Sequence, residues 1–215
     1  MTATTAVPAP NLNPLAQLKA GRLTRRLIQL YVGLACYGIS FGVMVHSHLG
    51  LPPWAVLDYG IAEHLPLTIG QSSIGVAFLV LLMWIPLRQW PGLGTISNAL
   101  VIGVVLDLTL WALDRPDQLW IRIAFLVFGI VGNGLATAMY IGAQFGAGPR
   151  DGLMTGLVRR TGLSVRLIRT TIEVAVLAIG FVLGGIVGLG TVAYALAIGP
   201  LAQLFLPHFR VRLDK

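Results

Sequence analysis

The residues best suited to chemistry lie in one short segment, residues 146–152, with the sequence Gly-Ala-Gly-Pro-Arg-Asp-Gly. Its glycines allow a tight turn or close approach of the backbone to a ligand. Proline is favoured as a first helical residue, where free N–H groups form a positive helix end that can hold an anion. The alternative is that the segment only ends one helix and starts the next. The substrate-binding residues predicted from this segment are Gly146, Gly148, Pro149, Arg150 and Asp151.

Further polar residues lie within apolar runs. Arg169 and Glu173 are four positions apart, so on a helix they share a face and can form an ion pair. A carboxylate inside an apolar helix is a candidate proton relay, ion ligand or substrate contact, and the alternative for Glu173 is a purely structural pair. Asp107 is a second candidate for carrying a coupling ion. Gln144 and Gln203 are predicted to line the same binding site.

Other chemistries find little support in the chain. It contains no nucleotide-binding loop and no arrangement of nucleophile, base and acid. His46, His48 and His64 match no zinc spacing, and the lone Cys36 can form neither an internal disulfide nor a two-cysteine metal site. We therefore expect no catalytic residues, no metal and no cofactor, and no enzymatic activity. A lipid-modifying membrane enzyme stays open as an alternative.

The composition indicates an integral membrane protein. Charged residues make up 11% of the 215 residues, against about 25% in soluble domains, and hydrophobic residues make up 56%. Mean hydropathy is +0.81. Because each span needs about 20 apolar residues, the chain has room for one membrane domain and no soluble catalytic domain. The net charge of +7 is then a topology signal rather than a sign of a nucleic-acid partner.

The chain repeats itself without a gap after a shift of 96 positions. The run Gly92-Leu93-Gly94-Thr95 recurs as Gly188-Leu189-Gly190-Thr191, and Pro53 falls on Pro149. Duplicated membrane units place binding sites where their copies meet. The sequence therefore predicts two copies, about 26–114 and 122–210, within one transmembrane domain (21–215) that follows a disordered tail (1–20). The tail lacks the apolar core of a signal peptide.

Six apolar runs are predicted to span the membrane, with Thr95 and Thr191 as helix N-caps. The runs are Leu27–Val45, Leu67–Leu87, Thr95–Leu113, Ile123–Phe145, Val165–Leu183 and Thr191–Leu206. Each copy also holds a short proline-started helix, Pro53–His64 or Pro149–Arg160, which is too short to span and too polar to face lipid. The predicted fold is an all-α, polytopic membrane protein with six transmembrane helices as a 3+3 inverted repeat. If the short helices dip into the membrane, their N-termini approach each other, and Pro53 and Trp54 join the site.

The distribution of positive charge agrees with this topology. With both termini in the cytoplasm, all but two of the 15 Lys and Arg residues lie in cytoplasmic segments, and the exceptions are Arg115 and Arg122. An odd number of spans in each copy inverts the second copy relative to the first.

The Gly146–Leu153 run, followed by Arg169, Glu173, the second Gly-Leu-Gly-Thr run and Gly199-Pro200, resembles the YczE-like bacterial membrane proteins, which are related to the YitT group. The resemblance implies a bacterial cytoplasmic (inner) membrane protein. Transport, especially export, has been proposed for relatives. The first copy departs from the motif, with Trp54 and Ala55 in place of Arg150 and Asp151, so a site would be chemically asymmetric.

These features together predict a small-molecule transporter, a permease or exporter, with a central site between two inverted repeats. One half would rock against the other, and the substrate would be anionic or zwitterionic. Expected partners are the lipid bilayer and this substrate, with a homodimer permitted by paired glycines such as Gly38 and Gly42. The alternatives are a substrate-binding subunit of a multi-component importer and a membrane scaffold or chaperone.

Overall fold

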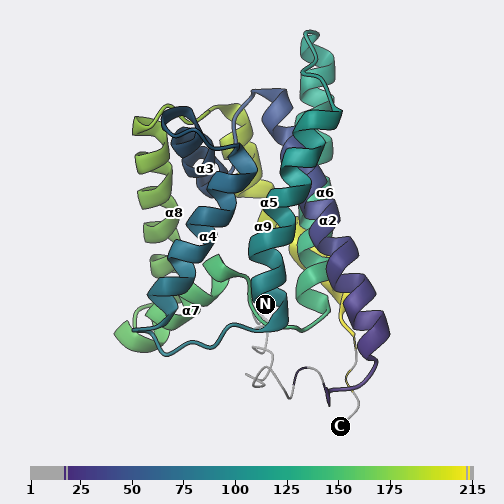
Figure 1. Cartoon of the computed structure of the whole chain (residues 1–215), viewed down its shortest axis with the longest axis vertical. Coiled ribbons are helices and arrows are strands. Elements are labelled where there is room, and N and C mark those ends of the chain that lie inside the picture. Colours follow the sequence, from purple (N-terminus) through teal and green to yellow (C-terminus); the bar gives the residue numbers. More distant parts are fainter. Residues whose placement is uncertain (1–16, 18, 212, 214–215) are drawn as a thin grey trace, which may run out of the picture.

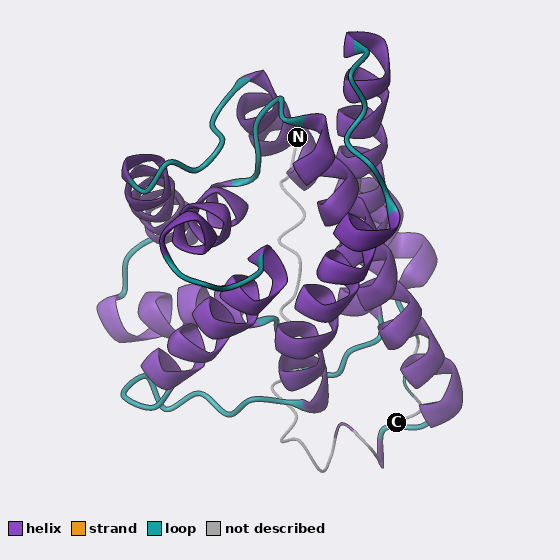
Figure 2. Ribbon diagram, turned by 45° about the horizontal axis from the view of Figure 1, so that its top comes forward, coloured by secondary structure: helices purple, strands orange, loops and turns teal. Residues whose placement is uncertain are grey.

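The computed structural model describes residues 17, 19–211 and 213, and regular structure in this part of the chain is entirely helical (Figures 1 and 2). Most of the predicted disordered tail lies outside the described residues. Eight helices follow one another in the described chain: α2 (Leu23–Ser47), α3 (Pro53–His64), α4 (Ile69–Trp84), α5 (Leu93–Ala112), α6 (Leu119–Gly142), α7 (Pro149–Thr161), α8 (Val165–Val182) and α9 (Leu189–Phe209).

The helices α6 to α9 start 96 positions after α2 to α5, each at the residue that the repeat specifies. Pro53 and Pro149 are the first residues of α3 and α7, as predicted. The N-cap prediction for Thr95 and Thr191 is wrong by one turn. Glycines at 92 and 188 hold the N-cap positions, and the two threonine hydroxyls accept hydrogen bonds from their backbone N–H groups (3.1 and 3.2 Å).

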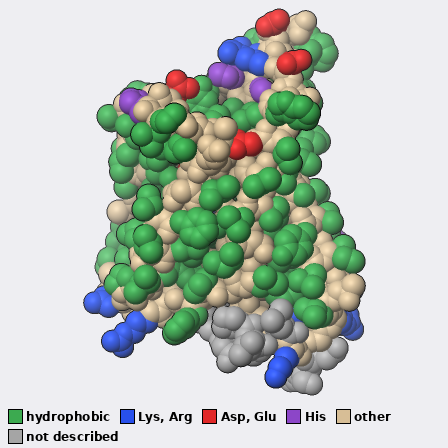
Figure 3. All heavy atoms as spheres, in the orientation of Figure 1, with side chains coloured by type: hydrophobic (Ala, Val, Ile, Leu, Met, Phe, Trp, Pro, Cys, Tyr) green, Lys and Arg blue, Asp and Glu red, His purple; other side chains and the backbone are tan. Residues whose placement is uncertain are grey.

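Four helices, α2, α5, α6 and α9, are long and apolar enough to cross a membrane. A fifth crossing is possible if α3 and α4, which bend by 116° at their junction, form one broken span. A six-span arrangement additionally requires α8 to cross, although it carries Arg166, Arg169 and Glu173. Apolar side chains cover the middle of the face in Figure 3. Lys and Arg side chains lie around the end near the chain termini, whereas acidic and His side chains lie at the other end together with further Lys or Arg side chains.

The helices form two groups, and each contains elements of both copies. In the long-helix bundle (α2, α5, α6 and α9), α2 packs against α5 and α6, and α6 packs against α9. In the short-helix group (α3, α4, α7 and α8), α3 packs against α8, and α4 against α7. Helices α3 and α7 lie toward opposite ends of the molecule (Figure 1). The boundary between the groups therefore does not separate one copy from the other, and the expected rocking of one half against the other stays a prediction.

Each of the two central helices is capped by an arginine from the other copy. Arg26 of α2 donates to both carbonyls of residues 143–144, at the end of α6 (2.9 and 2.8 Å). Arg122 of α6 donates to both carbonyls of residues 47–48, at the end of α2 (2.7 and 3.0 Å). These carbonyls have no partner within their own helix. The arginines therefore hold the two copies together, and Arg122 has a structural reason to lie at the less basic end.

A second reciprocal contact fixes the turns that precede α3 and α7. The Gly94 N–H donates to the Phe145 carbonyl (2.9 Å), and the Gly190 N–H donates to the Leu49 carbonyl (2.7 Å). Gly50 and Gly146 follow these carbonyls with φ of +119° and +105°, a backbone conformation that glycine adopts readily and other residues rarely adopt. Each short helix thus starts from a turn that the opposite copy holds in place.

The paired glycines serve contacts within the chain. Methyl groups at Gly38 and Gly42 would lie 2.7 Å from Val105 and Thr109 of α5. These glycines therefore let α2 and α5 cross closely, and the predicted homodimer stays a prediction.

Replacing Arg26 by Met should lower the free energy of unfolding by roughly 2–5 kcal/mol, because each buried carbonyl that loses its donor costs about 1–3 kcal/mol. Arg122→Met should act in the same direction but less strongly, since Arg122 is only partly buried whereas Arg26 is fully buried. Thermal unfolding in detergent measures both effects. The matched control is Arg25→Met, an exposed neighbour. Equal melting temperatures for the Arg25 and Arg26 variants would contradict the capping role.

Candidate functional site

A cavity of about 460 Å³ lies between the long-helix bundle and the short-helix group. The bundle contributes mainly aromatic, apolar and uncharged polar side chains, and the short-helix group contributes the charges. The lining includes Tyr37, Phe41, Asn98, Ile102, Tyr140, Tyr194, Ile198 and Gln203 from the bundle, and Ser73, Ala77, Gly148, Pro149, Arg150, Asp151 and Arg169 from the short-helix group.

A smaller hollow of about 120 Å³ shares part of this lining. It has Arg150, Asp151 and Arg169 in common with the larger cavity, and Glu173 lines it as well. The first copy adds residues 53–54 from the start of α3. The two spaces therefore form one candidate site at the starts of both short helices.

Arg150 joins the two short helices. Its guanidinium donates to Asp58 Oδ2 (3.1 Å) and lies over the Trp54 ring, 4.8 Å from the ring centroid. Arg150 and Trp54 are each the second residue of their helix and are equivalent in the repeat. The predicted approach of the two helix N-termini is therefore present, and the two residues in contact are among those that distinguish the copies.

Asp58 is the buried partner of Arg150. Its side chain is 0% exposed, and the Ser73 hydroxyl of α4 interacts with its carboxylate. A buried carboxylate needs such a partner, because desolvation of an unpaired charge costs several kcal/mol. Asp58 is not among the site residues predicted from the sequence. The sequence feature that could have indicated Asp58 is its position one helical turn after Trp54, which puts both side chains on one face of α3.

Asp151 connects the short-helix group to the long-helix bundle. As the third residue of α7 it lies at the positive end of that helix, and it accepts a hydrogen bond from the Tyr140 hydroxyl (3.0 Å). Nearby, the Tyr194 hydroxyl of α9 donates a hydrogen bond to Asn133 Oδ1 of α6 (2.8 Å). This contact was not predicted from the sequence either. The tyrosines thus order one wall of the cavity around Asp151.

Arg169 and Glu173 form the ion pair that their spacing predicted, with Nε and Oε1 2.9 Å apart. The two side chains are 55% and 36% exposed, in contrast to the fully buried Asp58. Because exposed pairs contribute little to stability, this pair can be exchanged for contacts to a ligand at small energetic cost.

The other predicted residues separate into two sets. Gln203 lines the cavity, whereas Gly146, Gln144 and Asp107 lie outside the lining. Gly146 forms the turn before α7, and Gln144 has a left-handed backbone (φ 58°) with its side-chain amide donating to the Val211 carbonyl.

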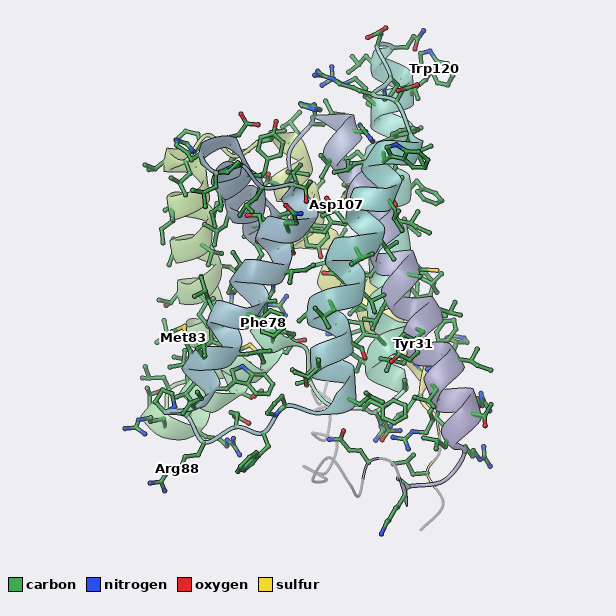
Figure 4. All side chains as sticks on the ribbon, viewed as in Figure 1. Tyr31, Phe78, Met83, Arg88, Asp107 and Trp120 are labelled. Carbon is green, nitrogen blue, oxygen red and sulfur yellow. The ribbon has the colours of Figure 1, made fainter. Side chains whose placement is uncertain are left out.

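Asp107 holds the start of α4. Its carboxylate accepts hydrogen bonds from the Thr68 hydroxyl and from the Gly70 N–H (2.8 Å). Figure 4 labels Asp107 at the height where α4 begins, far from Arg88 at the opposite end of the molecule. This carboxylate therefore connects α4 to α5 rather than facing the cavity.

Comparison with known proteins supplies the family. Residues 24–207 match the family described as "Family of unknown function (DUF6198)". The chain belongs to this family. It is 44% identical over 177 residues to an uncharacterized protein of Haemophilus influenzae, a match covering 82% of this chain and 81% of the relative. It is 31% identical over 176 residues to the uncharacterized membrane protein YczE of Bacillus subtilis, with 81% of each chain covered. The predicted resemblance to the YczE-like proteins is thus confirmed, and the chain is a membrane protein.

A third relative is the uncharacterized protein YyaS of Bacillus subtilis, 26% identical over 184 residues, with 83% of this chain and 92% of the relative covered. No solved structure matches the chain.

The Arg150–Asp58 pair should behave as a coupled unit. Arg150→Gln leaves the Asp58 carboxylate buried without its partner, and breaking a buried pair in this way costs about 3–5 kcal/mol of stability. The double variant Asp58→Asn/Arg150→Gln removes both charges and should recover most of the loss. Thermal unfolding of Asp58→Asn, of Arg150→Gln and of the double variant measures the coupling. Single effects that simply add in the double variant would contradict the pairing.

Proposed function

We propose that the protein is a small-molecule transporter of the bacterial cytoplasmic membrane, and that the cavity between the two helix groups is its substrate site. The observation that carries the proposal is the charged lining at the starts of α7 and α3 inside an apolar, helical chain. Ionisable groups inside a membrane protein are costly and mark substrate or ion pathways. A volume of about 460 Å³ is in the range of small-molecule sites.

The proposed topology has six crossings in two inverted copies, with both termini in the cytoplasm. The helices α2, α5, α6 and α9 cross directly, α4 crosses together with the bent α3, and α8 crosses with its charges toward the site. Three observations support this topology: the matched helix starts, the positions of α3 and α7 toward opposite ends, and the basic side chains near the chain termini (Figures 1 and 3). Basic residues favour the cytoplasmic side.

The chemistry of the site favours a zwitterionic substrate. Arg169 is half-exposed, near the positive end of α7, and can bind a substrate carboxylate. Asp151 has the opposite charge on the same wall and can bind an ammonium group. Arg150 is already bound to a buried partner, so its proposed role is to position the start of α7. The wall residues Tyr37 and Tyr194 supply aromatic contacts for the apolar part of the substrate.

Glu173 is the proposed coupling group. Glu173 lines the smaller hollow together with Arg169, its ion-pair partner. When a substrate carboxylate replaces Glu173 on the arginine, the Glu173 carboxylate becomes free to bind a proton. Asp107 is not assigned this role, because its carboxylate is occupied by the start of α4. A cavity with charged walls favours transport over the scaffold alternative, for which a filled interior is expected.

Uptake into proteoliposomes tests the transport role, with a labelled panel of neutral amino acids, organic anions and amines. The zwitterions should be taken up best. Arg169→Gln should weaken apparent affinity by about tenfold or more, the expected effect of losing a hydrogen bond to a charged group. Glu173→Gln should remove the response to an imposed proton gradient. Glu63→Gln and Arg159→Gln, at exposed positions, are the matched controls. Uptake that is unchanged when Glu173→Gln and Arg150→Ala are combined would contradict the site.

A further inference from the structure

Three tyrosines from three helices of the long-helix bundle converge on the cavity. They are Tyr37 of α2, Tyr140 of α6 and Tyr194 of α9, and all three line the space of about 460 Å³. The rings of Tyr37 and Tyr140 stand at 70° to each other, with their centroids 6.3 Å apart. Tyr194 lies beside them, and its side chain interacts with that of Tyr37. The bundle thus supplies adjoining aromatic walls to one part of the cavity.

Two of these rings are held in place by their own hydroxyl groups. The Tyr140 hydroxyl donates to Asp151 Oδ2 (3.0 Å), and the Tyr194 hydroxyl donates to Asn133 Oδ1 (2.8 Å). Asn133 is only 1% exposed, so the second bond is anchored inside the bundle. Because both hydroxyl protons are engaged with the protein, Tyr140 and Tyr194 offer a ligand mainly the surface of their rings. The bonds also restrict how the rings can turn, so this aromatic surface is preorganised.

The charges around the tyrosines favour a cation. The Asp151 carboxylate lines the cavity beside the Tyr140 ring to which it is bonded. Ring faces carry negative potential, so the rings and the carboxylate attract the same kind of group. The cavity's arginines, Arg150 and Arg169, come from the short-helix group, and each forms an ion pair with a different carboxylate. Among the described lining residues, the bundle itself contributes no Lys or Arg.

The type of cation follows from what these walls can offer. A primary ammonium has three N–H donors and is strongly hydrated, so moving it into the cavity requires several acceptors. Asp151 is one acceptor, and others would have to come from more distant lining residues such as Asn98 and Gln203. A quaternary ammonium has no N–H group to satisfy, and its methyl groups contact aromatic rings while the ring faces attract its charge. Adjoining rings with one carboxylate therefore match a methylated ammonium better than a primary one.

We propose that Tyr37, Tyr140 and Tyr194 form an aromatic cage for a quaternary ammonium group, with the Asp151 carboxylate as its counter-charge. The substrate class is then a betaine, a molecule in which a quaternary ammonium is joined to a carboxylate, and this carboxylate binds Arg169. The apolar part of the substrate that contacts the tyrosines is the methylated ammonium itself. This inference rests on the proposed substrate site, and it adds the chemical class of the substrate and the residues that select it.

Calorimetric titration of the purified full-length protein tests the cage without a transport assay. One set of probes is trimethylglycine, free glycine and tert-butylacetate, which has the shape of trimethylglycine without its positive charge. A second set, γ-aminobutyrate and its trimethyl derivative, covers a wider separation of the two charges. The better-fitting trimethyl compound should bind about tenfold or more tightly than its parent amine, and trimethylglycine should exceed tert-butylacetate, because a desolvated cation–π contact is strong. This comparison uses the unaltered protein, so it does not depend on how well a variant folds.

Variants of Tyr37 separate recognition by the ring from packing alone. Tyr37→Leu should weaken binding of the trimethyl compounds by about tenfold and should change binding of tert-butylacetate much less. Tyr37→Phe keeps the ring and should retain the affinity of the unaltered protein. Tyr31→Leu is the matched control, because Tyr31 is also on α2 but lies outside the lining of both spaces, and it should bind every probe as the unaltered protein does.

The outcomes distinguish the cage from the transport function. Parent amines that bind as tightly as their trimethyl derivatives would overturn the cage. So would equal losses for trimethylglycine and tert-butylacetate in Tyr37→Leu, or failure of both trimethyl compounds to bind. In each of these cases, uptake of other zwitterions would still support the proposed function. Binding with the cage's selectivity but without uptake into proteoliposomes would instead defeat the transport function alone.

Discussion

The fold depends on the need to satisfy the backbone carbonyls at the ends of α2 and α6. These carbonyls lie in buried or partly buried positions, where a backbone group that loses its partner costs about 1–3 kcal/mol. Arg26 caps the end of α6 and Arg122 caps the end of α2, so neither copy completes its own helix. The N–H groups at Gly94 and Gly190 repeat this reciprocity in the turns that follow. These contacts pair the copies and direct the starts of α3 and α7 toward each other.

A symmetric frame then carries an asymmetric site. Where the frame requires a particular backbone, the copies agree, as they do at Gly50 and Gly146 and at the two helix-starting prolines. Around the cavity they differ, and the charge belongs largely to the second copy. The differing pairs are Trp54 and Arg150, Ala55 and Asp151, Ser73 and Arg169, and Ala77 and Glu173. The charged side chains of the cavity thus come mainly from one copy of a duplicated chain.

Local patterns in the sequence predicted the helices and their order well, because apolar runs, prolines and glycines act within a few residues. The Arg169–Glu173 pair follows from helix geometry alone and is present. Contacts between distant segments were not accessible in this way. Arg26 reads as a topology signal, yet its guanidinium is buried as a helix cap. In the sequence Asp107 has the features of an intramembrane acid. Its partners, Thr68 and Gly70, are known only from the packing of α4 beside α5. The grouping of helices across the copies likewise follows from packing, which the repeat does not specify.

The central claim is that the two copies are inverted in the membrane, and the ends of α3 and α7 test it most directly. Glu63 and Arg159 are equivalent, exposed residues near these ends. In the Cys36→Ala background, each is replaced singly by cysteine and treated with an impermeant thiol reagent. The account predicts labelling of Glu63→Cys on intact cells, and labelling of Arg159→Cys only after the cells are permeabilised. Labelling of both positions from the same side would contradict it.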